Sequence, residues 1–138
     1  MDVKTIWYGM QAVFATVAGW FGYFLGCWDG LLYALFAFTV IDYFTGVLCA
    51  VVERKLSSAI GMKGIVKKVT IFLIVGVAHV IDGVIGKGEL VRTATLIFFI
   101  SNEGISLLEN AGRIGLPIPP KLKDILSQLH SGRKKKGE

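Results

Sequence analysis

Charged residues are scarce in this sequence of 138 residues: they make up 18% of it, whereas apolar residues make up 54%. A soluble domain of this size exposes much of its surface, and so few charges cannot supply the polar coat that it needs. The two cysteines are too few for a disulfide framework or a zinc site. The many apolar and aromatic side chains exclude a disordered chain. The class that remains is an integral membrane protein with short loops.

Motifs for catalysis and for cofactor binding are also missing from the sequence. There is no nucleophile with a base and an orienting partner, no glycine-rich phosphate loop and no cluster of metal ligands. The net charge of +5 comes from two short regions that do not alternate with aromatic residues, which argues against nucleic-acid binding. The sequence therefore predicts a non-enzymatic protein without a cofactor or a bound metal.

Four apolar segments are long enough to cross a hydrocarbon core about 30 Å thick. Residues 5–28 form the first and contain no charged residue. The others are residues 31–52, 66–85 and 90–110, which contain a few charges. A central charge costs roughly 2.5–3.5 kcal/mol, which neighbouring Leu, Ile, Phe and Val side chains offset. We predict an all-α fold with four transmembrane helices within residues 1–115; the alternative is that the last three are core helices of a soluble domain.

Basic residues gather in two regions and predict the orientation. One region lies between the second and third segments and includes Lys63, Lys67 and Lys68, while the other follows the last segment. Because basic loops stay in the cytoplasm, we expect both regions on the inner face of the membrane. Four spans then place both termini in the cytoplasm.

Residues 116–138 are predicted to form a short amphipathic helix followed by a basic tail. Prolines end the preceding helix, and Pro120 suits the first turn of a new one. An apolar stripe and flanking lysines predict that this helix lies on the inner membrane surface, and the alternative is a solvated tail. The residues concerned are Leu122, Ile125, Leu126 and Leu129, beside Lys121 and Lys123.

Two of the predicted helices carry a polar stripe. Ionisable residues inside a membrane normally face a bundle interior or a water-filled cavity. The stripes therefore predict either the lining of an aqueous pore or a polar seam inside a closed bundle, and composition leaves both open. The stripe residues are Asp42, Thr45 and Gly46 on the second helix, and Asn102, Glu103, Ser106, Glu109 and Asn110 on the fourth.

Two further features concern the outer half of the predicted bundle. Asp82 and Arg92 lie on the same side of the membrane in this topology, so we expect them to form an ion pair. On the first helix, the small residues Ala18, Gly22 and Gly26 recur at a spacing of four. Such a face lets helices approach closely in lipid, either between copies of the chain or within one copy.

Several stretches of this sequence resemble a known family. In order, residues 42–46, 61–68, 98–110 and 116–122 are similar to the phage-lysis and toxin-secretion holins of Gram-positive bacteria and their phages, which include the clostridial toxin-export holins. The most specific stretch is Asn-Glu-Gly-Ile-Ser followed by Glu-Asn, within residues 98–110. The N-terminal 28 residues match only in hydrophobicity, and no catalytic residues are known in the family.

The resemblance implies a small protein that accumulates in the bacterial cytoplasmic membrane and assembles with copies of itself. At a set time it would permeabilise the membrane and let an endolysin or a toxin leave. Two alternatives stay open: a small ion channel or transporter subunit that uses Asp42, His79 and Glu103, and an antiholin-type membrane anchor. A second start at Met10 would yield a shorter product, of the kind that serves as the inhibitory antiholin partner in some holin systems.

Overall fold

The computed structural model describes residues 1–86 and 88–131, with side chains up to Gln128, and these residues form five α-helices and no strand. The all-α prediction is thus confirmed. The helices are α1 (Val3–Phe24), α2 (Gly30–Val52), α3 (Ser58–Ile85), α4 (Leu90–Ile114) and α5 (Pro120–Ser131). The predicted basic tail, residues 133–136, and the side chain of Leu129 lie outside the described residues.

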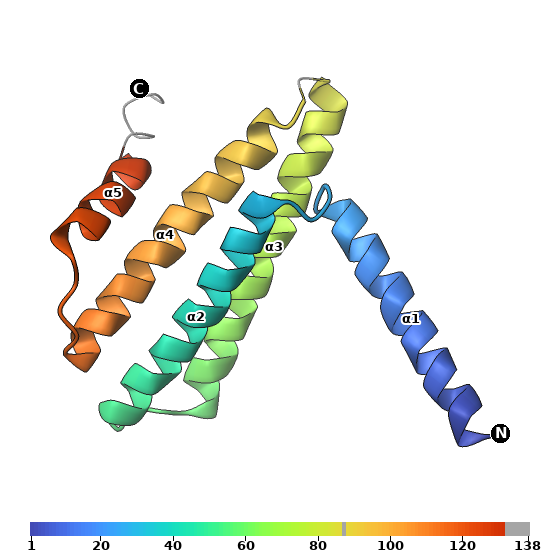
Figure 1. The fold of residues 1–138 in the computed structure, drawn as a ribbon, viewed down its shortest axis with the longest axis horizontal. Helices are drawn as coiled ribbons and strands as arrows, with labels where there is room; N and C mark the ends of the chain where they lie inside the picture. The colour runs from blue at the N-terminus through green and yellow to red at the C-terminus, as the bar shows by residue number, and fades with distance from the viewer. Residues whose placement is uncertain (87, 132–138) are drawn as a thin grey trace.

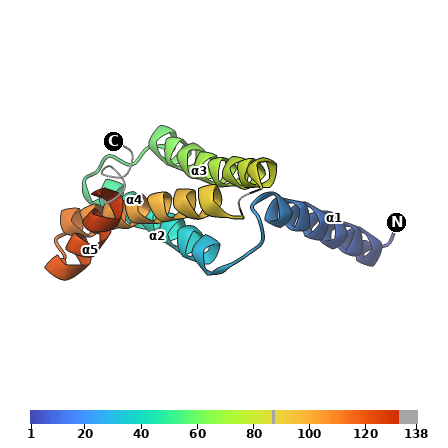
Figure 2. The same ribbon diagram turned by 90° about the horizontal axis from the view of Figure 1, so that it is seen from above.

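A bundle of α2, α3 and α4 forms the body of the protein, with α4 at its centre (Figure 1). Helix α4 contacts α2 along its length, α3 on another side and α5 on a third. Apolar side chains fill the centre of this bundle, namely Leu25, Leu32, Leu35, Ile71, Val75 and Leu96. Helix α1 projects away from the bundle, as both views show (Figures 1 and 2).

Among the described residues, three helices are long and apolar enough to cross a membrane: α2, α3 and α4. The prediction of four spanning helices is therefore wrong for the first segment. Helix α1 has no charge after Lys4, but Trp7, Tyr8, Gln11 and several glycines lower its mean hydropathy. Tryptophan and tyrosine prefer the membrane–water interface to the hydrocarbon core, so the absence of charge was insufficient evidence for a span.

Capping residues set the helix boundaries. The Asp29 side chain accepts a hydrogen bond from Leu32 N at 2.9 Å, and Ser57 Oγ accepts one from Ile60 N at 3.2 Å. Such side chains satisfy the free N–H groups of a first helical turn. Because Ser57 caps α3, this helix begins at Ser58 and includes most of the basic segment, well before the predicted start at residue 66.

Helix α1 ends earlier than predicted, at Phe24, and a tight turn joins it to α2. Gly26 (φ 84°) and Cys27 (φ 76°) take left-handed backbone conformations in this turn. A Cβ on Gly26 would lie 2.6 Å from His79 Nδ1 and 2.8 Å from Arg92 Nε, so only glycine fits here. Gly26 is therefore a turn residue and does not extend a helical face.

The other two small residues of the predicted packing face have no helix against them in this structure. Ala18 is exposed, and no described atom lies within 4 Å of the position that a Cβ on Gly22 would take. None of the residues of α1, all of which the structure describes, is buried. In this structure the face therefore does not pack against another helix of the same chain. Contact between copies of the chain stays a prediction.

The ring of Phe24 attaches α1 to the bundle at Gly76 of α3. A Cβ at Gly76 would lie 1.9 to 2.5 Å from three ring carbons of Phe24, so any side chain here must displace the ring. We expect Gly76→Ala to cost about 1–3 kcal/mol through overpacking and to detach α1. Faster proteolysis of the turn between α1 and α2 would report the detachment.

Gly83→Ala is the matched control on the same helix, because nothing described lies within 4 Å of its Cβ position. Alanine favours a helix by up to about 1 kcal/mol over glycine, so the turn between α1 and α2 should resist proteolysis in this variant as well as in the native chain. Equal proteolysis of the two variants would show that Phe24 does not hold α1.

Candidate functional site

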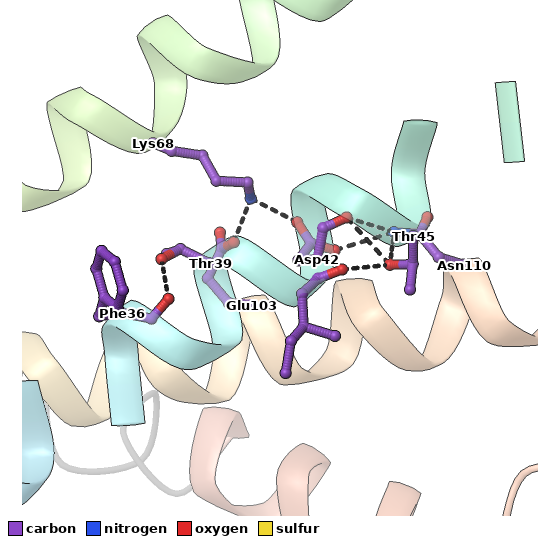
Figure 3. A network of polar contacts seen from close by, with 8 residues as sticks. Phe36, Thr39, Asp42, Thr45, Lys68, Glu103 and Asn110 are labelled. Carbon is purple, nitrogen blue, oxygen red and sulfur yellow. Dashed lines mark hydrogen bonds and ion pairs between the residues drawn. The ribbon is translucent and has the colours of Figure 1, made fainter. Parts of the chain in front are cut away.

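Five polar side chains from α2, α3 and α4 meet inside the bundle (Figure 3). We call them the Lys68 cluster: Asp42, Thr45, Lys68, Glu103 and Asn110. Lys68 Nζ lies 2.5 Å from Asp42 Oδ2 and also donates to Glu103 Oε2, so one ammonium group bridges two carboxylates. Asp42 comes from α2, Lys68 from α3 and Glu103 from α4. The lysine therefore links all three helices that could span a membrane.

Asn110 extends the cluster between α2 and α4. Its Nδ2 lies 3.0 Å from Asp42 Oδ1 and 3.1 Å from Thr45 Oγ1. The Cys49 thiol lies 3.2 Å from the Asn110 carbonyl oxygen, to which it donates. The two polar stripes predicted on these helices thus face each other along one seam.

The two carboxylates of the cluster are buried, which makes their pairing necessary. Glu103 is 1% exposed and Asp42 is 7% exposed. Ionised groups taken out of water lose several kcal/mol of hydration, which a partner at hydrogen-bond distance offsets. Lys68, together with Asn110 at Asp42, therefore supplies the partners that keep these carboxylates inside three helices with long apolar surfaces.

Lys68 was predicted at the membrane surface together with Lys63 and Lys67, and the structure corrects this placement. Since α3 already begins at Ser58, Lys67 and Lys68 lie on a regular helix and point about 100° apart. Lys63 and Lys67 are exposed, whereas Lys68 points between α2 and α4. The sequence signal that could have revealed it is the pair of carboxylates, which requires a cation on a neighbouring helix.

The remaining stripe residues lie around the cluster. Gly46 and Ser106 line a hollow that also contacts Asp42 and Asn110, and the exposed Lys67 lies on the wall of the same hollow. The hollow thus connects the outside of the helix pair α2 and α3 with a buried carboxylate. Asn102 is half-buried and Glu109 is exposed. Of the two arrangements considered, a pore lining or a closed seam, this single chain adopts the closed seam.

A second polar cluster lies at the other end of α4, around Arg92. The guanidinium is completely buried. Its Nε donates to the Leu25 carbonyl at 2.6 Å and its Nη2 donates to the Cys27 carbonyl at 2.9 Å. Its Nη1 lies 2.6 Å from Asp29 Oδ2. One side chain therefore holds the whole turn between α1 and α2 against α4.

The predicted ion pair between Asp82 and Arg92 is replaced by a different arrangement. The Asp82 carboxylate accepts the backbone N–H groups of Val91 at 2.9 Å and of Arg92 at 2.8 Å. It thus caps α4 from the neighbouring helix, where the N-cap residue Glu89 makes no capping bond of its own. The guanidinium pairs with Asp29, which the sequence analysis missed, and its hydrogen bond lowers the pKa of that carboxyl group.

An exposed ion pair joins the ends of α2 and α4 on the side of the Lys68 cluster. Arg113 donates to Glu53 through Nε at 3.0 Å and through Nη2 at 2.7 Å. The hydrogen bonds from Arg113 lower the pKa of Glu53. Because both side chains are substantially exposed, water screens this pair and its contribution to stability is small.

The sequence is similar to those of known proteins. A family model described as the bacteriophage holin family matches residues 19–131. An uncharacterized protein of Halalkalibacterium halodurans is 41% identical over 88% of this chain and 93% of its own length. A protein of Bacillus phage phi105 named a probable holin is 37% identical over 72% of this chain and 73% of its own length. No solved structure gives a significant match.

Proposed function

The chain belongs to the bacteriophage holin family and is a multi-pass membrane protein, and from that premise we propose that it assembles in the bacterial cytoplasmic membrane and opens a lesion there. An endolysin or a secreted toxin would leave the cell through it. The observation that carries this proposal is the family match over residues 19–131. The relative from phage phi105, named a probable holin, supports it.

The Lys68 cluster suggests how a closed chain becomes part of a lesion. In one chain Asp42, Glu103 and Asn110 bond across the two helices or to Lys68, so these three side chains do not face lipid. If copies assemble and α3 moves away from α2 and α4, the same side chains can face water. Asp42, Glu103 and Asn110 would then line the lesion, with Ser106 and Gly46 beside them.

Basic residues suggest the orientation. Lys63 and Lys67 near the start of α3, and Lys121 and Lys123 on α5, would lie on the cytoplasmic side, where anionic lipids attract them by about 1 kcal/mol each. The Arg92 cluster would then lie on the outer side. With three spans, the two termini would lie on opposite sides of the membrane, the C-terminus in the cytoplasm and the N-terminus on the outer side.

Inducible expression in a bacterium tests the proposal. Membrane potential and the release of a cytoplasmic enzyme are followed together after induction. Abrupt and delayed loss of both would support a holin lesion. Loss of potential with the enzyme retained would replace the proposal with a small channel. If neither changes, and a partner holin is delayed by co-expression, the chain acts as an antiholin-type anchor.

Glu103 should control the timing of this event. Glu103→Gln keeps the size of the side chain but removes the charge that pairs with Lys68, so we expect a shifted onset of enzyme release. Leu96→Ile is the control, since Leu96 is fully buried in the same helix but has an apolar side chain that pairs with no charge. Unaltered onset in both variants would contradict the assignment of Glu103.

A further inference from the structure

Helix α5 occupies a different place from the membrane surface that its amphipathic sequence predicts. It begins at Pro120, as expected, but folds back along α4 on the side away from α3 (Figure 1). Among the side chains of α5 that the structure describes, Leu126 is buried, with 8% exposure, whereas Leu122 and Ile125 are 44% and 47% exposed. The docked helix thus uses one of the apolar side chains that a membrane-bound helix would insert.

The seat of Leu126 is formed by Gly104 of α4 and Phe38 of α2. A Cβ at Gly104 would lie 3.1 Å from both terminal carbons of Leu126 and 3.2 Å from the ring of Phe38. Closer to the turn, Ile118 reaches Gly112, where a Cβ would lie 3.4 Å from its Cδ1. Gly104 therefore gives α5 its close contact with α4, and Gly112 admits Ile118 of the segment that connects the two helices.

If α4 crosses a membrane, the docked position would hold charged residues of α5 beside the hydrocarbon core. Gly104 lies about 15 Å along the helix from Ile114, at 1.5 Å per residue, which is near the middle of a hydrocarbon core about 30 Å thick. Helix α5 brings exposed Lys121, Lys123 and Asp124 alongside α4. These residues precede Leu126 and so lie nearer the end of α4, but they still stand beside a helix that crosses the membrane, where a charged side chain is costly unless α5 leaves its seat.

We propose that α5 exchanges between two positions, its seat on α4 and an anionic membrane surface, and that the seated form is inhibited. On the surface, Leu122, Ile125 and Leu126 all enter the lipid while Lys121 and Lys123 meet anionic headgroups. In the seat, α5 covers one side of α4, so a neighbouring copy cannot pack there. The inhibition rests on the holin function proposed above, but the exchange does not.

A disulfide between positions 104 and 126 measures the exchange. The full chain carries Gly104→Cys and Leu126→Cys, with Cys27→Ser and Cys49→Ser to remove the native thiols. It is placed in phosphatidylcholine vesicles with increasing phosphatidylglycerol. We expect the yield of disulfide to fall as phosphatidylglycerol rises, and less steeply when Lys121→Gln and Lys123→Gln are added. A yield independent of phosphatidylglycerol would overturn the exchange.

Ile125→Asn distinguishes the seated form of α5 from the membrane-bound form. Ile125 is exposed in the seated helix, so this change should not weaken the seat, but it should weaken membrane insertion and raise the disulfide yield. Gly104→Cys with Ile125→Cys, in place of the pair at 104 and 126, should give little disulfide. Equal yields from the two pairs would contradict the seated geometry.

The same disulfide tests inhibition. Oxidised protein should lose the ability to release a trapped enzyme from vesicles, and reductant should restore it. Release at the native rate from oxidised protein would overturn the inhibition. If the reduced protein releases nothing in any lipid, the proposed function fails, while the dependence of disulfide yield on phosphatidylglycerol still decides the exchange.

Discussion

Replacing Lys68 by methionine is expected to lower the free energy of unfolding by about 3–5 kcal/mol, because it leaves Asp42 and Glu103 buried beside each other without a cation. Methionine keeps most of the length of the lysine side chain, so the loss reports the charge and not a cavity. The measurement is the loss of helical signal as denaturing detergent is titrated into protein in mild micelles.

Lys67→Met and a triple variant make this prediction specific. Lys67 is the exposed neighbour on the same helix, and its replacement should leave unfolding nearly unchanged. Adding Asp42→Asn and Glu103→Gln to Lys68→Met removes every charge of the cluster, and should recover most of the lost stability because neutral groups carry a smaller burial cost. Equal losses for Lys67→Met and Lys68→Met would refute the central role of the cluster.

Replacing Arg92 by leucine should have an effect of similar size, about 3–5 kcal/mol, since the buried guanidinium donates three hydrogen bonds and a hydrogen bond from a charged group contributes about 1.5–3 kcal/mol. The change also leaves the carbonyl groups of Leu25 and Cys27 without their donor. We expect the turn between α1 and α2 to leave α4, so that proteolysis there becomes fast before the bundle unfolds. Limited proteolysis together with detergent unfolding measures both effects.

Two comparisons test the geometry at Arg92. Arg92→Lys keeps the charge, but an ammonium group cannot reach three acceptors as the planar guanidinium does. The free energy of unfolding should therefore fall by less than in Arg92→Leu. Arg113→Ala removes an arginine that makes two hydrogen bonds at an exposed site, and should hardly change stability. A turn that stays protected in Arg92→Leu would mean that Phe24 and the α1 packing hold it instead.

Local sequence signals predicted much of the architecture. The start of α5 at Pro120 and the polar stripes of α2 and α4 depend on nearby residues or on helical periodicity. The stripes predicted that Asp42, Glu103 and Asn110 face either an aqueous pore or a closed polar seam. Such features can be predicted because they do not require knowledge of which helix lies beside which.

The partners of these side chains could not be predicted in the same way. Lys68 stands in a basic segment that is typical of a membrane surface, and its role depends on where α3 begins and how that helix is rotated. Asp29 pairs with Arg92 because the turn between α1 and α2 folds onto α4, a contact between residues far apart in the sequence. Pairing across helices is a property of packing, which periodicity alone does not determine.

Helix α1 shows a further limit of sequence patterns. A run without charge was interpreted as a span, but tryptophan, tyrosine and glycine make the run less apolar than its length implies. The structure attaches α1 through Phe24 at Gly76, with Phe21 half-buried beside it, and leaves the residues before Phe21 exposed.

Release of two trapped markers from one set of vesicles tests the central claim most directly. Purified full-length protein is added to anionic vesicles that hold a small dye and a protein-sized dextran. The account predicts that the dextran leaves together with the dye, after a delay that Glu103→Gln changes. Release of the dye alone would contradict a holin lesion and identify a small selective pathway.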